Sequence, residues 1–315
     1  MRNSLALLVI VTVACSQAQP AGRPTSPPSS ATCQLPVSIT EAPDHVRGAF
    51  VEFPGGKLTI DPAGDAGAYY ARSLSRWLPI GRTSVSPDQA RYAYVEPKLV
   101  TAPDQIRIHV VDVSTGGDQA YKIGLPVSPA GLVIVSFAPE GVWLSHAGYE
   151  GPGGKLFLLD LSSGLVKDVS GSHDIVDPVA DTPGVFWFTD GGPKPELTDI
   201  GFPLPARLSR ITISGGIVET WYSEPGSYLR ALWADVAGHP IFARWNAKSQ
   251  ANEVWVASSP GQARLIGLPQ GAYQLFADHD HGVWLGGEHG IYLYTDTGQL
   301  QKVSTQAATP AGICA

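Results

Sequence analysis

The stretch Asp280-His281-Gly282-Val283-Trp284-Leu285 is the clearest copy of a pattern that recurs along the chain, a tight turn followed by a hydrophobic strand. Turn-forming Asp, Pro and Gly residues come first, and aromatic and β-branched residues follow, as is typical of half-buried strands. The other copies are centred near His45, Gln89, Gly141, Gly184 and Gly238, so successive copies stand 43 to 54 residues apart. The chain is therefore expected to be a series of similar units built from strands.

Each unit also has a second half, in which a hydrophobic strand meets a Gly-containing turn. Examples are Ile108–Asp112 before Ser114-Thr115-Gly116, and Ile291–Tyr294 before Asp296-Thr297-Gly298. A strand, a Gly turn and a second strand predict a β-hairpin. Two hairpins give four antiparallel strands per unit, and repeats of this length are typical of propeller blades. The sequence predicts an all-β fold, a closed β-propeller of about six four-stranded antiparallel blades.

The first repeat is the weakest copy, because its second half, Ala68–Ile80, lacks the Gly turn. Seven blades is the alternative count, and it requires a further copy within Lys57–Ile80. In either arrangement the first strand of each blade is expected to line the central axis.

The composition agrees with a strand-rich globular fold. The 315 residues include 35 Gly and 27 Pro, more chain-turning residues than a helical protein carries, and 43% hydrophobic residues provide a sizeable core. The net charge of -7 provides no basic footprint for nucleic acid or for an anionic lipid surface. We expect no nucleic-acid partner and no cofactor.

The first 15 residues have the features of an export signal. Arg2 precedes an apolar run, Leu5–Ala14, that is too short to span a bilayer. Thr12-Val13-Ala14-Cys15 resembles a bacterial lipobox, in which cleavage leaves a lipidated Cys at the new N-terminus. Ser16-Gln17-Ala18 offers an ordinary signal-peptidase site as the alternative.

Residues 16–32 are rich in Pro, Ser, Ala and Gln, so they cannot bury a core and are expected to form a flexible tether. The propeller domain is expected to occupy residues 33–315. The protein is expected at the outer face of a cell membrane or in the periplasm, held by the lipid anchor alone, or secreted if the alternative site is cleaved.

Three cysteines are an odd count for an exported protein. If Cys15 carries lipid, Cys33 and Cys314 remain at the two ends of the folded region. An oxidising compartment favours a disulfide between them, and such a bond would tie the first and last segments of the ring together. We expect the strand candidate Leu35–Ile39 to pair with, or closely approach, the strand around Gln301–Ser304 and so bring the two thiols together. Two unpaired thiols are the alternative.

Two repeats resemble those of known bacterial propellers. Ser86-Pro87-Asp88 before Tyr92-Ala93-Tyr94 resembles the repeat of TolB-like and WD40-like propellers, and Asp278–Leu285 with Gly290–Tyr294 is similar to the repeat of two-component-regulator propellers. The likeness extends over about residues 42 to 305. The resemblance implies a propeller fold, but these short motifs occur in propellers of many functions.

The polar cluster Asp278-His279-Asp280-His281 contains the most ligand-like side chains, because imidazole and carboxylate suit divalent transition metals. It occupies a tight turn, however, where Asp shapes the bend and adjacent residues rarely converge on one ion. We therefore assign no metal site and no catalytic residue, and keep these four residues as weak metal candidates.

Length variation among the repeats collects in the connections between the second and third strands, which all project from one face of the ring. Insertions on one face of a repeat protein often mark the binding face. The candidate binding residues there and in the adjoining blade connections are Tyr149, His173, Asp174, Lys194, Glu196, Asp199, Phe202 and Trp245. Tolerated surface insertions are the alternative reading.

These observations predict an exported, lipid-anchored propeller that acts as a non-catalytic binding or scaffold module at the cell envelope. Its partner is an unidentified protein, small molecule or glycan. The alternative is a lyase- or hydrolase-like propeller enzyme with its site on the loop-rich face, similar to propeller lyases of the virginiamycin B lyase type.

Overall fold

Strands alternate with short turns throughout the part of the chain that the computed structural model describes. It describes residues 32–42, 45–65, 68–96, 106–125, 131–146, 154–191, 205–246 and 251–314. Within these ranges, no helix is long and apolar enough to cross a lipid bilayer. The expected signal peptide and most of the expected tether lie outside the described residues.

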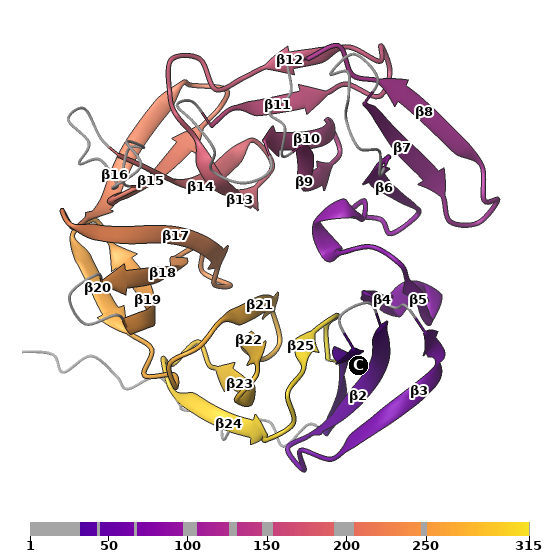
Figure 1. The fold of residues 1–315 in the computed structure, drawn as a ribbon, viewed down its shortest axis with the longest axis vertical. Helices are drawn as coiled ribbons and strands as arrows, with labels where there is room; N and C mark the ends of the chain where they lie inside the picture. Colours follow the sequence, from indigo (N-terminus) through magenta and orange to yellow (C-terminus); the bar gives the residue numbers. More distant parts are fainter. Residues whose placement is uncertain are drawn as a thin grey trace, which may run out of the picture. The chain divides into compact units, whose positions relative to one another are not determined.

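Six of the seven antiparallel sheets that the described residues form are arranged as blades around an axis, and the seventh is a short two-stranded hairpin (Figure 1). Blades 3 to 6 each have four strands that follow one another in sequence from the axis outward. Their strands are β9 (Leu132–Ala138), β10 (Gly141–His146), β11 (Leu156–Leu159) and β12 (Val166–Asp168); β13 (Val176–Thr182), β14 (Val185–Asp190), β15 (Arg207–Thr212) and β16 (Ile217–Ser223); β17 (Ser227–Ala234), β18 (Pro240–Asn246), β19 (Ala251–Ser259) and β20 (Gln262–Leu265); and β21 (Tyr273–Asp278), β22 (Gly282–Gly287), β23 (Gly290–Tyr294) and β24 (Leu300–Ser304). The prediction of an all-β, six-bladed propeller is confirmed.

Strand direction defines two faces of the ring. The turns between the first and second strands and between the third and fourth strands lie on one face, here called the turn face. The connections between the second and third strands and between successive blades lie on the other, here called the loop face.

Blade 1 is assembled from both ends of the described chain. Its sheet has the order β25 (Thr309–Pro310), β1 (Cys33–Ala42), β2 (His45–Phe53) and β3 (Leu58–Asp65). The C-terminal strand β25 pairs with β1 through Val37 and Ser38 and takes the innermost position (Figure 1).

This closure corrects two details of the sequence reading. The turn near His45 joins the second and third strands of blade 1, so this copy is out of phase with the other five. The strand at Gln301–Ser304, expected to help close the ring, is part of the outer strand of blade 6, and β25 performs the closure. The turn near His45 was assigned to the wrong pair of strands because turns between first and second strands and turns between second and third strands have similar sequences.

Blade 2 lacks a regular inner strand. Its sheet contains β6 (Arg91–Val95), β7 (Arg107–Asp112) and β8 (Asp118–Lys122), and only a single bridge from Val85 to Tyr92 continues it inward. The 3-10 turn η2 (Arg82–Ser84) precedes that bridge, and the Thr83 hydroxyl donates a hydrogen bond to Ile134 O of blade 3 at 3.2 Å. The expected first, inner strand of this blade is therefore replaced by a turn.

The stretch that would have supplied a seventh blade has another structure. Residues 57–80 form β3, the short hairpin β4 (Tyr69–Ala71) and β5 (Arg76–Leu78), and the 3-10 turn η1 (Arg72–Leu74) between them. This hairpin fills the junction between blades 1 and 2. The alternative count of seven blades is wrong.

The recurring turn-strand motif has a physical basis in Gly and Trp. Gly141 and Gly282 begin second strands with φ of 145° and 120°. A Cβ on Gly282 would lie 2.4 Å from Tyr294 O of the next strand, so only Gly fits. Two residues later, the indole N–H of Trp143 donates to Glu140 Oε1 at 3.0 Å, and that of Trp284 donates to Asp278 Oδ2 at 3.1 Å. Each turn acid thus holds the Trp of its own blade.

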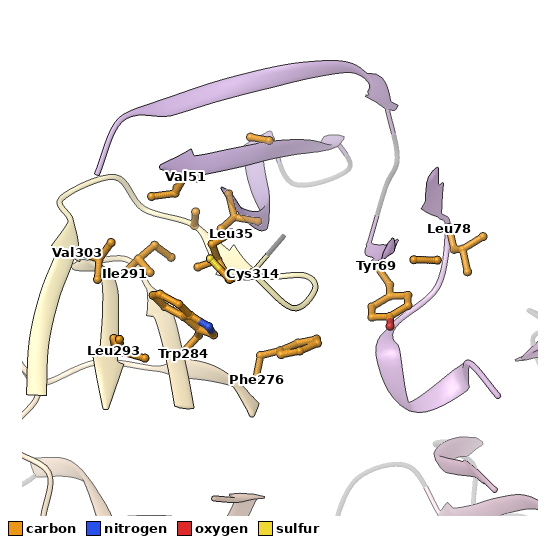
Figure 2. Packing of buried hydrophobic residues seen from close by; sticks show 14 of the residues in the cluster. Leu35, Val51, Tyr69, Leu78, Phe276, Trp284, Ile291, Leu293, Val303 and Cys314 are labelled. Carbon is orange, nitrogen blue, oxygen red and sulfur yellow. The ribbon is translucent and has the colours of Figure 1, made fainter. Parts of the chain in front are cut away.

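The hydrophobic core is divided among the junctions between blades. Each of five clusters combines residues from neighbouring sheets, as in the cluster that joins Trp143 of blade 3 to Phe186 of blade 4. The cluster at the closure includes Leu35 and Val51 of blade 1 and Trp284 of blade 6 (Figure 2). Because each blade is covered by its neighbours, the core is complete only when the ring is closed.

A disulfide between Cys33 and Cys314 lies at the closure, with the Cα atoms 5.6 Å apart. Cys33 begins β1, and Cys314 follows β25, so the bond takes the place of the covalent turn that joins the first and second strands in other blades. The backbone N–H of Cys314 donates to Asp278 Oδ2 of blade 6 at 3.1 Å, which connects the joint to the neighbouring blade.

Replacing both cysteines, Cys33→Ala and Cys314→Ala, is expected to lower the melting temperature without changing the far-ultraviolet circular dichroism spectrum. The bond closes a loop across a sequence separation of 281, for which the chain-entropy treatment gives an upper value of about 5 kcal/mol. Calorimetry of the double variant and of the reduced wild type should show similar decreases in melting temperature. Thiol labelling of both residues in unreduced, denatured wild-type protein would contradict the bond.

Candidate functional site

An axial channel runs between the inner strands of the blades. A cavity of 640 Å³ lies at its loop-face end and a second of 340 Å³ at its turn-face end. Both are lined by Thr83, Val135, Ala180 and Trp233, so the two cavities adjoin at the level of these side chains. Propeller rings offer a concave, pre-formed site at this position, and the channel is the candidate functional site.

The loop-face cavity contains a strained acidic residue. Asp177, in β13, has φ of 45°, in the left-handed region that non-glycine residues rarely adopt. The pairing of β13 with β14 is interrupted by a bulge in β13 between Val176 and Val179, and Asp177 within this bulge lines the channel. Backbone strain that the surrounding sheet maintains is often found at functional sites.

Asp177 faces Arg230 of β17, with Arg230 Nε 3.4 Å from Asp177 Oδ2. Burial raises the pKa of the Asp177 carboxyl, and the Arg230 charge only partly offsets this. Burial and the Asp177 charge together raise the pKa of neighbouring Tyr228. The loop-face end therefore carries a carboxyl, a guanidinium and a phenol in one partly desolvated group.

A smaller side pocket of 310 Å³ adjoins this end between blades 5 and 6. Tyr228, Trp245 and Tyr273 line it, and it shares Arg230 and Leu232 with the main cavity. The Trp245 side chain is 42% exposed, an unusual degree for a large aromatic residue. The side pocket provides an aromatic surface beside the channel.

The turn-face cavity contains Arg82 of η2. Its guanidinium carbon lies 4.1 Å from the centre of the Phe276 ring and 5.1 Å from that of Trp233, within the range of cation–π contacts. Arg82 Nη1 donates to Ala277 O at 3.3 Å. The side chain thus reaches from blade 2 to the inner strands of blades 5 and 6.

The structure places only some of the candidate binding residues. Tyr149, Lys194, Glu196, Asp199 and Phe202 lie outside the described residues. β10 and β14 end on the loop face, and β11 and β15 begin there. That these five residues belong to a binding face stays a prediction.

Trp245 lines the side pocket at the loop face. His173 and Asp174 lie in the connection from blade 3 to blade 4, where the His173 backbone N–H donates to Ser170 O. Neither side chain is among the channel-lining residues, whereas Asp177, three residues later, is.

Two of the four weak metal candidates, Asp278 and His281, are in contact within the turn. Asp278 is an acceptor for the turn: Oδ1 accepts the Asp280 N–H, and Oδ2 accepts from His281 Nδ1, Trp284 Nε1 and the Cys314 N–H. Burial raises the pKa of Asp278, but these hydrogen bonds outweigh it and lower the pKa overall. His279 lines the turn-face cavity, away from this group.

Among the described residues, Cys33, His281 and Cys314 have metal-ligand spacing. His281 Nε2 lies 3.6 Å from Cys33 Sγ. The two sulfurs are bonded to each other, however, and a disulfide offers no thiolate to a metal ion. The two cysteines close the ring through their disulfide, and His281 lies beside it.

Sequence reasoning missed Arg82, Arg230 and Trp233. All three belong to inner segments of blades, where side chains on one face of the strand point to the axis. A charged or aromatic residue in an inner strand can be predicted to line the channel, but only after the sequence has shown which strand of each blade is the inner one. Arg82 lies in a 3-10 turn, so the sequence shows no strand pattern there that would identify an inner strand.

The six sheets, their closure by a C-terminal strand and the axial channel define a closed β-propeller. No known protein family and no curated protein matches the sequence. Among solved structures, TolB from Acinetobacter baumannii is similar in fold, with a TM-score of 0.50 and 16% identity over 89% of this chain and 67% of that one. The resemblance to TolB-like propellers seen in the sequence is thereby confirmed at the level of fold.

Two enzymes are also structural neighbours at lower scores. The acylaminoacyl peptidase from Pyrococcus horikoshii has a TM-score of 0.42 and 12% identity over 68% of this chain, which spans only 37% of that protein. An oligogalacturonate lyase in complex with manganese has a TM-score of 0.46 and 13% identity, covering 82% of this chain and 71% of that one. These likenesses extend to the fold alone.

Replacing Asp177 by Asn is expected to stabilise the protein, and by more at pH 7 than at pH 4. An acid whose pKa is raised on folding costs no stability below its unfolded pKa, and destabilises progressively as pH rises through the folded value. Asn also tolerates the left-handed backbone. The measurement is denaturant unfolding of the variant and wild type from pH 3 to pH 8.

Asp174→Asn, an exposed nearby position outside the channel lining, is the matched control for removal of one negative charge. A stability difference for Asp177→Asn that shrinks with rising pH would show that the raised pKa is wrong.

Proposed function

We propose that this protein is an exported, lipid-anchored β-propeller that acts as a non-catalytic binding module at the cell envelope. Residues 1–15 serve as the signal peptide with Cys15 as the lipidation site, residues 16–32 as the tether, and residues 33–315 as the binding domain. The axial channel carries the proposal, because it is a pre-formed cavity with an apolar wall and a few polar groups, the usual character of a small-molecule site.

The disulfide supports the export part of the proposal. Cys33 and Cys314 are bonded across the ring closure, and structural disulfides persist in oxidising compartments outside the cytoplasm. The apolar run before Cys15 points to the same destination from independent residues. A tether between Cys15 and Cys33 would let the ring stand clear of the membrane.

The enzyme alternative rests on one observation. His146 and Asp177 line the same loop-face cavity, and an imidazole and a carboxyl with a raised pKa are typical components of acid–base sites. Asp177, however, faces Arg230, and its side chain is already committed to that ion pair. We therefore favour binding without turnover.

The test is to incubate the purified protein with a low-molecular-mass extract of cell envelopes, remove free compounds by gel filtration, and identify those released on denaturation. We expect an enriched compound that is recovered chemically unchanged, because binding alone leaves its mass as it was. Ala180→Trp, which fills the channel where the two cavities meet, should abolish the enrichment.

Ile217→Trp is the matched control, because Ile217 belongs to the outer strand of the same blade and is 64% exposed. If Ala180→Trp does not fold, Val135→Trp tests the same level of the channel from blade 3. Enrichment that survives a filled channel would refute the channel as the site, and release of a chemically altered compound would support the enzyme alternative.

Cys15→Ser is expected to release the protein from the membrane fraction or to leave its precursor uncleaved, because a serine side chain cannot be lipidated as the lipobox cysteine is. Fractionation followed by immunoblotting and by the mass of the mature N-terminus measures both effects. Unchanged membrane attachment of a normally processed variant would contradict lipidation and favour cleavage after Ala18.

A further inference from the structure

Arg82 belongs to the segment that stands in place of the inner strand of blade 2. Blade 2 has no regular inner strand, and η2 stands in its place. The inner strand of adjacent blade 1 is only two residues long. The Arg82 side chain reaches blade 6, where its guanidinium lies over Phe276 and donates to Ala277 O. A cation is thereby held at the turn-face end of the channel.

No carboxylate neutralises this cation among the described residues. Its polar contact is with a backbone carbonyl, and no described Asp or Glu lies within ion-pair distance. Burial accordingly lowers the pKa of Arg82, although nearby Tyr69 and Asp278 act in the opposite direction. An arginine stays protonated at neutral pH, so a partly buried charge without a counter-ion remains.

The acidic groups nearest to the cavity are engaged elsewhere. Asp278 accepts four hydrogen bonds within its own turn and at Cys314. Asp235 accepts from the Ala237 and His239 backbone N–H groups and holds His239 Nδ1 at 3.0 Å. Either carboxylate could rotate toward the guanidinium only by breaking the hydrogen bonds that hold its own turn together. An anion from solution is the group that would complete the site.

The remaining wall of the cavity is more apolar than polar, and its polar members include Thr83, Ser136, Thr182, Asp235 and His279. Val85, Val135, Ala180 and Trp233 contribute to its wall, and its volume of 340 Å³ suits a small organic molecule. The guanidinium carbon lies over the Phe276 and Trp233 rings and Nη1 donates to Ala277 O, so Nε and Nη2 are left for two-point contact with a carboxylate. A doubly charged phosphate would place excess negative charge near Asp235 and Asp278, so a single negative charge fits better.

We propose that the turn-face end of the channel binds small molecules with one carboxylate group and an apolar body, with Arg82 as the anion-binding group and Trp233 against the apolar part. This assignment rests on the proposed binding function of the channel and names the ligand class of that site. The loop-face end, where Arg230 is already paired with Asp177, provides no second free cation among the described residues.

A purely structural role for Arg82, as a brace between blades 2 and 6, makes a different prediction. A brace would affect stability, but it would not make binding depend on the charge of a ligand. The decisive measurement is therefore the selectivity between a carboxylate and its neutral amide, which a structural role would not alter.

The experiment measures binding of 3-phenylpropionate and of 3-phenylpropionamide to the purified protein by calorimetry, with inorganic phosphate as a third probe. We expect the carboxylate to bind about 10- to 100-fold more tightly than the amide, as a charge-assisted pair would give. Arg82→Gln should remove this difference while leaving amide binding within about two-fold, and phosphate should not compete.

Arg76→Gln is the matched control, because Arg76 is an exposed arginine on the β4–β5 hairpin and loses the same charge outside the channel. If Arg82→Gln does not fold, Arg82→Lys should keep a weakened preference for the carboxylate. Equal binding of carboxylate and amide to the wild type would overturn the role of Arg82 but leave a binding channel. Binding of neither probe at millimolar concentration would overturn this ligand class, while the envelope-extract experiment separately decides whether the channel binds at all.

Discussion

Closure of the ring is the constraint on which the rest of the structure depends. A strand at the open edge of a sheet exposes unpaired backbone groups, and a propeller with an open joint would also expose the hydrophobic faces of its first and last blades. Here the ring is closed by strand pairing of only two residues of β25 with Val37 and Ser38. The disulfide and the cluster around Leu35 and Trp284 supplement that pairing with a covalent bond and buried apolar surface.

The same joint shapes the channel. A two-residue inner strand in blade 1 and a 3-10 turn in blade 2 leave two successive blades without a full strand at the axis. In the other four blades, regular inner strands present mainly small or apolar side chains to the channel, such as Val135 and Ala180. Irregularity and charge therefore occur together: Arg82 comes from the turn that replaces a strand, and Asp177 sits at a bulge in β13.

The two ends of the channel differ in their electrostatics. Asp177 and Arg230 neutralise each other at the loop face, beside the aromatic side pocket with Trp245. At the turn face Arg82 has aromatic rings and a carbonyl as neighbours, but no described carboxylate. A ligand that enters the channel would meet a paired, nearly neutral end and a positive end, which favours one orientation of a molecule with a single negative charge.

The sequence by itself determined the architecture. Gly282 and Trp284 with their counterparts in other repeats reveal the blade unit, because the chemistry of a tight turn and a half-buried strand is local and repeats whenever the unit does. The positions of Cys33 and Cys314 at the two ends of the folded region also predicted where a bond would help. Tertiary structure alone decided that β25 and not Gln301–Ser304 closes the ring, that the turn near His45 belongs between second and third strands, and that Arg82 faces Phe276 and Trp233. These features depend on which segments meet across the axis, and contacts between residues some 200 positions apart leave no periodic trace in a single chain.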